Sequence, residues 1–103
     1  MIYLLVQSTL IPGKMAEFNE IAAKELLPRY QSQGTKLVAS FHSYTGNMND
    51  IYTLYAFNDL AGFQKFRENQ NNPEARKTGP KLQALRANMI STLIEPNPWS
   101  PMK

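Results

Sequence analysis

The chain contains no cysteine, so it can form no disulfide, no thiolate zinc site and no cysteine nucleophile. It has one histidine and eight scattered carboxylates, which is little material for a metal site, and we predict no bound metal. The longest apolar run, Met1–Val6, is far shorter than the ~20 residues that a membrane-spanning helix needs. It also lacks the basic start of a signal peptide. These absences predict a cytoplasmic protein without membrane contact.

The residues that are present have the balance of a globular protein. The 103 residues are 43% hydrophobic and 18% charged. A chain of this length buries roughly 60–65% of its unfolded surface, which is enough for a core without covalent cross-links. We therefore predict a single domain over residues 1–103.

Basic side chains are concentrated late in the chain. The net charge is only +3, but residues 61–86 contain six basic residues and only two acidic ones. The six basic residues are Lys65, Arg67, Arg76, Lys77, Lys81 and Arg86. A nucleic-acid-binding protein usually has a denser basic cluster and a recognisable motif, so we expect no nucleic-acid partner. The favoured interpretation is a solvated helix face, and the alternative is a weak anion or phosphate site.

The hydrophobic periodicity predicts the element order β-α-β-β-α-β. Strands are expected over residues 2–11, 36–45, 51–57 and 88–94, with turn residues 46–49 joining the middle two as a hairpin. Helical spacing begins at Met15, and Pro28 should kink or end this helix near Leu27. A second helix should start at Asn58 or Asp59, restart at Asn72-Pro73-Glu74 and be interrupted at Gly79-Pro80. This order is that of a ferredoxin-like α+β domain with a split βαβ motif.

The strands are apolar on both faces, although two helices can cover only one face of a four-stranded antiparallel sheet. The hairpin pattern favours placing the helices over the face with Leu37, Ala39, Phe41, Leu54 and Ala56. The opposite face would then stay uncovered, with Leu4, Val6, Val38, Ile51, Tyr55 and Phe57. An apolar patch of this size is typical of a partner surface, and a second copy packed about a two-fold axis is the simplest partner. We therefore predict a homodimer through this sheet face.

Several short motifs, in order along the whole chain, resemble the NIPSNAP family. The matching features are Ile2-Tyr3, Leu10-x-Pro12-Gly13-Lys14, Leu37-Val38, Gly46, Leu54-x-Ala56-Phe57 followed by Asp59-Leu60, Asn72-Pro73-Glu74 and the tail at residues 96–101. The chain also departs from that family. It has Leu4 and Val6 where members commonly alternate Glu and Arg, Ala75 in place of a usual Trp, and Ile90 and Ser91 in a last strand that is usually polar. If those polar groups form a site in the family, this chain lacks it.

The resemblance implies a dimeric α+β barrel. Eukaryotic members of the family are linked to mitochondria and vesicle traffic. The wider superfamily includes cofactor-independent monooxygenases, haem-degrading enzymes and small isomerases or lyases. Such a likeness of fold indicates where a pocket lies and not which reaction occurs there.

The candidate site lies on the hairpin face that mixes polar and apolar residues. An even hairpin loop would pair His42 with Thr53 and place them on one face with Ser40, Tyr44 and Tyr55, above an apolar floor that includes Val6. This face would point to the barrel interior or the dimer seam. The favoured interpretation of His42 is a hydrogen-bonded interface residue, and the alternative is a base that deprotonates a phenolic or enolic ligand.

Two classes of function follow. The first is a dimeric protein that binds a small apolar or aromatic molecule between sheet and helices. The second is a cofactor-independent monooxygenase- or isomerase-like enzyme with His42 as base, acting on a small aromatic or carbonyl compound. We favour the first because an enzyme pocket usually gathers several convergent polar groups. We expect no cofactor, since nothing near His42 specifies haem and no glycine-rich phosphate loop is present.

The proline-rich tail carries the only tryptophan, Trp99. A large ring gains much by burial, so residues 96–101 are predicted to be ordered, with Trp99 docked on its own subunit or on the partner.

Overall fold

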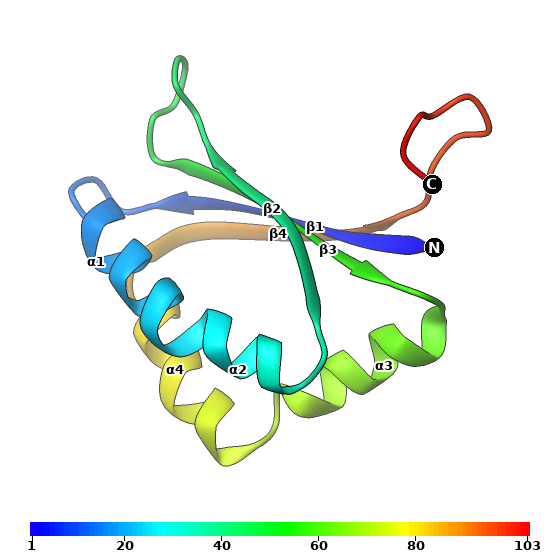
Figure 1. Cartoon of the computed structure of the whole chain (residues 1–103). Coiled ribbons are helices and arrows are strands. Elements are labelled where there is room, and N and C mark those ends of the chain that lie inside the picture. The colour runs from blue at the N-terminus through cyan, green and yellow to red at the C-terminus, as the bar shows by residue number, and fades with distance from the viewer.

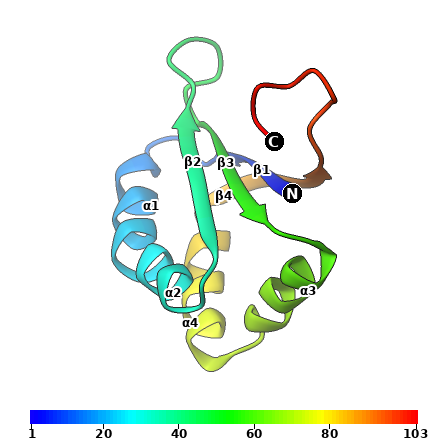
Figure 2. The ribbon, with the colours of Figure 1, turned by 45° about the vertical axis from the view of Figure 1, so that its right-hand side comes forward.

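The computed structural model describes all 103 residues and has an α+β fold. Its four strands are β1 (Ile2–Leu10), β2 (Lys36–His42), β3 (Asp50–Phe57) and β4 (Arg86–Ile94). They form one antiparallel sheet in the order β2-β3-β1-β4. The helices lie together on one face of the sheet (Figures 1 and 2). The predicted ferredoxin-like order is therefore confirmed.

The helices begin where the sequence supplies capping residues. α3 (Leu60–Asn69) begins after Asp59, whose carboxylate accepts a hydrogen bond from the Gly62 amide at 2.9 Å. α4 (Pro73–Gln83) begins after Asn72, whose side-chain oxygen accepts a 2.7 Å bond from the Ala75 amide. Both caps were predicted, and in α4 the proline at the first position has no N–H to leave unpaired.

Pro28 was expected to kink or end the first helix and does not end it, and the interruption expected at Gly79-Pro80 is wrong. The first helical stretch runs as α1 (Met15–Ile21), a π-helical segment η1 (Ala22–Leu26) and α2 (Leu27–Ser32), so it continues past Pro28. A proline ring clashes with the carbonyl four residues before it, and the wider π turn just ahead of Pro28 gives that ring room. Likewise, α4 continues through Gly79 and Pro80 without a break.

The predicted assignment of the two sheet faces is also wrong. The helices cover the face with Leu4, Tyr55 and Phe57, which form one cluster with Tyr30 of α2 and Phe66 of α3. Val6 and Ile51 lie on this same covered face, since Val6 pairs with Thr53 and Ile51 with Ser8. The face left uncovered carries Leu5, Ala39, Phe41, Tyr52, Leu54, Ile90 and Ile94.

A bulge in β2 contributes to this difference. The register shifts between Leu37 and Ala39, so Val38 has no partner in the ladder. Leu37 consequently pairs with Tyr55 and packs toward the helices, whereas Ala39 pairs with Leu54 and faces away from them. The hairpin is also two residues out of the expected register, because His42 pairs with Ile51 and Ser40 with Thr53.

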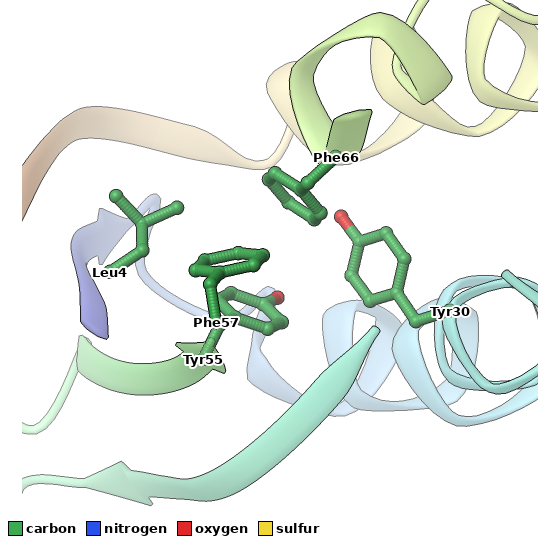
Figure 3. Packing of buried hydrophobic residues seen from close by; sticks show 5 residues of the cluster. All are labelled: Leu4, Tyr30, Tyr55, Phe57 and Phe66. Carbon is green, nitrogen blue, oxygen red and sulfur yellow. The ribbon is translucent and has the colours of Figure 1, made fainter. Parts of the chain in front are cut away.

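The core under the helices is divided into two clusters. In the first, the rings of Tyr30, Tyr55, Phe57 and Phe66 meet at centroid distances of 5.4–5.6 Å. Figure 3 shows Tyr30 reaching from α2 toward Phe66 of α3, with Tyr55 and Phe57 on β3 beside them. The second cluster joins Leu10 and Ile51 of the sheet to Phe18 of α1, together with Leu82 and Leu85. Leu26 of η1 packs against both clusters and spans the space between them.

The C-terminal tail folds back toward the uncovered face. Pro96, Ser100 and Met102 line a small cavity with Tyr3, Leu54 and Ile94, all on that face. Trp99 is nevertheless 81% exposed. The expectation that its ring docks on its own subunit is therefore wrong. None of the helices combines the length and the apolar character needed to cross a bilayer.

Candidate functional site

Two adjoining cavities lie between the sheet and the helices. The larger has a volume of about 470 Å³ and extends toward α4 and the edge strand β4, where Met89 and Ser91 are exposed at its rim. The smaller has a volume of about 210 Å³ and lies under α1 and η1. The two share five lining residues: Val6, Leu26, Tyr30, Tyr55 and Arg86. Together they provide room for a small organic molecule in the covered layer.

The cavities bring together four of the six residues predicted from sequence. Val6, Ser40, Thr53 and Tyr55 all line the smaller cavity. The Ser40 and Thr53 hydroxyls are hydrogen-bonded to each other across the hairpin at 3.1 Å. Together with Ser8, Asn19 and Arg86 they form the polar part of a mostly apolar wall.

The other two predicted residues lie outside both cavities. His42 shares the strand face of Ile51 but is exposed at the last position of β2. Tyr44, in the loop beyond it, is 90% exposed. Neither side chain lines the space where Tyr55 lies.

Arg29 is the charged residue that sequence reasoning missed. It is only 6% exposed on α2, and its guanidinium carbon lies 5.1 Å from the centroid of the Tyr30 ring. Its Nη2 donates one hydrogen bond of 3.3 Å to the side-chain oxygen of Gln70. Its Nε and Nη1 are buried without any partner. A buried guanidinium left this incompletely bonded is costly and therefore informative.

A second arginine and a tyrosine border both cavities. Arg86, the first residue of β4, lies 5.4 Å from the centroid of the Phe18 ring, and its buried Nε has no partner. Burial lowers the pKa of this guanidinium, which still stays charged at neutral pH. Burial also raises the pKa of the Tyr55 phenol, with Tyr30 adding to the shift. Tyr55 thus provides a neutral hydroxyl and no negative charge.

The helical spacing did contain a signal for Arg29. Steps of three and four residues from Met15 pass through Phe18 and Ala22 to Glu25 and Arg29, so both charged residues fall on the inward stripe. Glu25 is accounted for, because it accepts hydrogen bonds from Lys81 at 3.1 Å and from the buried Thr78 at 3.4 Å. Arg29 has no such ionic partner, and it lines the larger cavity.

The sequence model of the NIPSNAP family matches residues 3–101, which is nearly the whole chain. The chain belongs to the NIPSNAP family. A comparison with curated protein sequences found no match.

Solved structures of the family share this fold over their full length. Protein Atu4242 from Agrobacterium tumefaciens is 22% identical, with a TM-score of 0.89 and complete coverage of both chains. An uncharacterised NIPSNAP domain protein from Burkholderia xenovorans is 20% identical, with a TM-score of 0.87 over 98% of this chain and 99% of its own. The likeness extends to a putative antibiotic biosynthesis monooxygenase from Nitrosomonas europaea. That protein is 9% identical, with a TM-score of 0.72 over 93% of this chain and 98% of its own. At these identities the comparison shows the fold alone.

Proposed function

We propose that this NIPSNAP protein binds a small apolar or aromatic molecule in the cavities between its sheet and its helices. The observation that carries the proposal is the division of the core into two clusters with about 470 Å³ of space beside them. The space opens to solvent at the rim that Met89 and Ser91 form, so its apolar wall is in contact with water instead of being close-packed. A ligand that filled the space would remove this apolar surface from water.

The walls are suited to an aromatic body. Tyr30, Tyr55 and Phe66 present three rings to the larger cavity, and Leu4 and Val6 form its floor on β1. Aromatic groups gain by stacking on such rings beyond the area they bury. These apolar side chains favour binding by shape and apolar contact, and the same cavity is also lined by polar residues, among them Arg29, Arg76 and Arg86.

The alternative is a cofactor-independent monooxygenase- or isomerase-like enzyme with His42 as base. The likeness of fold to the Nitrosomonas europaea protein is compatible with it. A base must reach the ligand's proton within hydrogen-bond distance, however, and His42 lies outside both cavities. The binding function is therefore the one we propose, and a catalytic role for His42 stays a prediction.

Titration with indole, a neutral aromatic probe, tests the binding function. We expect amide NMR signals of cavity residues such as Val6 and Tyr30 to shift, and those of the uncovered face to stay unchanged. Placing a large ring at the rim with Ser91→Trp should weaken binding at least about tenfold by obstructing the cavity. Ala61→Trp, at an exposed site on α3, is the matched control and should bind as the parent does. Shifts confined to the uncovered face, or unchanged binding by Ser91→Trp, would contradict the proposal.

We further propose a homodimer through the uncovered sheet face. Phe41 is 62% exposed and Ile90 54% exposed on this face, and Leu54 lies between their strands. The face has few charges, and Asp50 at its end is already hydrogen-bonded by Thr9 at 2.6 Å. Two copies could therefore meet without like-charge repulsion, which suits a self-complementary two-fold contact. Such a contact would also bury the exposed Trp99 ring on the adjoining tail.

Sedimentation tests the dimer. The parent chain should sediment at about twice its 11.7 kDa mass at micromolar concentration. Ile90→Asp would bury two unpaired carboxylates at the contact, and it should raise the dissociation constant of the dimer at least about tenfold. Leu60→Asp also replaces an apolar residue by a charged one, but at an exposed position of α3. It should leave the dissociation constant of the dimer unchanged. A monomeric parent, or an Ile90→Asp variant that dimerises normally, would overturn the assignment of this face.

A further inference from the structure

We infer that the ligand of the larger cavity is an organic acid, with a carboxylate held beside Arg29 and an aromatic or apolar body against the rings of Tyr55 and Phe66. The inference rests on the proposed function and adds the chemical class of the ligand. Its starting point is a buried cation for which the chain supplies no counter-charge.

The polypeptide leaves Arg29 without an anion. The three ion pairs of the chain are Lys14–Glu17, Lys24–Glu20 and Lys81–Glu25, none of which involves Arg29. The single acceptor it reaches is the neutral side-chain amide of Gln70, which also donates to the Phe66 carbonyl at 3.2 Å. Its neighbour Tyr30 offers only the face of a ring. A buried cation in such surroundings is stabilised chiefly by an external anion.

The larger cavity itself is positive and contains no carboxylate. Arg29 of α2, Arg76 of α4 and Arg86 of β4 all line it, and its lining includes neither Asp nor Glu. Three separate elements therefore contribute an arginine to the lining, of which Arg29 is buried, Arg86 is half-buried and Arg76 is exposed. The buried Tyr55 hydroxyl stays protonated and can donate to an anion, since burial raises its pKa. This field repels cations and attracts anions.

The remaining walls decide between an inorganic anion and an organic acid. A phosphate or sulfate site is normally built from several backbone N–H groups and polar side chains that surround all the oxygens. Here the arginines share the cavity with the polar side chains of Gln70, Gln83 and Ser91, and also with five apolar residues that offer no hydrogen bonds: Leu4, Val6, Leu26, Phe66 and Leu82. A planar carboxylate matches the guanidinium fork, and a carbon skeleton matches the rest of the wall.

The test compares phenylacetate with phenylacetamide, which has the same shape and no charge, and with acetate, which has the charge and no ring. We expect the parent protein to bind phenylacetate at least about tenfold more tightly than either of the other two in calorimetric titrations. Arg29→Met should abolish the preference over phenylacetamide, and Arg29→Lys, which keeps the charge, should retain part of it. Arg67→Met removes an exposed arginine of α3 outside this cavity and should change nothing.

The outcomes separate the two proposals. Equal binding of phenylacetate and phenylacetamide by the parent protein would overturn the organic-acid inference and leave the binding of aromatic molecules standing. An Arg29→Met variant that folds and keeps the preference would overturn the role of Arg29. Binding of acetate as tight as that of phenylacetate would overturn the aromatic part. Failure of both aromatic probes to bind would contradict the proposed function and the inference together.

Discussion

We expect Arg29→Met to raise the free energy of unfolding by about 1–4 kcal/mol in the absence of ligand. Arg29 is 6% exposed, makes one side-chain hydrogen bond of 3.3 Å and leaves Nε and Nη1 without partners. Folding removes this cation from water without supplying an anion, and the cost is several kcal/mol per ion in proteins. Methionine has nearly the same length, can adapt to the same space and loses no hydration on burial.

Urea unfolding at fixed protein concentration, with Arg67→Met as the control, measures this effect. Arg67 carries the same charge at an exposed position, so its removal should change stability by no more than about 0.5 kcal/mol. Phenylacetate should then stabilise the parent protein and have less effect on Arg29→Met, because a ligand stabilises only the state that binds it. A clear loss of stability in Arg29→Met would show that the Tyr30 and Gln70 contacts outweigh desolvation. Arg29 would then be a structural residue.

The covered face could not have been chosen from the pattern of apolar residues alone. β1 has Leu4, Val6 and Leu10 on one side and Tyr3 and Leu5 on the other, so neither side is distinctly polar. The polar residues Ser40 and Thr53 made the covered face look like the uncovered one. They are accommodated there because they bond to each other and border a cavity. The usual rule that polar residues lie on the solvent-exposed face of a sheet therefore fails where the covered face borders a cavity.

The element order was predictable because its signals are local. The turn residues at 46–49 and the caps at Asp59 and Asn72 act within a few positions of themselves. The same rules left open whether the helix kinks or ends at Pro28, because its passage depends on a π turn formed just before it. That segment positions Leu26, Arg29 and Tyr30 over the sheet, so the missed feature is the one that builds the larger cavity.

Four residues of the candidate site followed from strand parity, whereas the place of Arg86 required tertiary contacts. Val6, Ser40, Thr53 and Tyr55 were placed together because alternate residues of paired strands share a face. Arg86 was counted only within a basic segment, and the first position of β4 was expected at residue 88. Its place at the junction of the two cavities depends on how α4 returns the chain to the sheet, which local patterns do not describe.

The aromatic cluster that closes the cavity is expected to depend on Phe66 more than on any other residue of α3. Phe66 is the one buried residue of this helix, and its ring contacts Tyr30, Tyr55 and Phe57 at centroid distances of 5.4, 5.6 and 5.4 Å. The other ring that α3 packs on the sheet is Phe63, which contacts Phe57 at a centroid distance of 5.6 Å. Phe66→Ala should therefore lower the free energy of unfolding by about 3–5 kcal/mol, the usual cost of deleting a buried phenylalanine.

Phe66→Ala should also change binding, because Phe66 is a wall of the larger cavity. Removing the ring leaves a void beside Tyr30 and Tyr55 that only a bulkier ligand fills. We expect the variant to lose affinity for phenylacetate and to be restabilised more by 1-naphthylacetate, which carries a second ring. Leu60→Ala, at an exposed site on the same helix, should change stability by no more than about 0.5 kcal/mol. A small destabilisation by Phe66→Ala, with binding unchanged, would show that α3 is held by other contacts and that its ring does not form the ligand site.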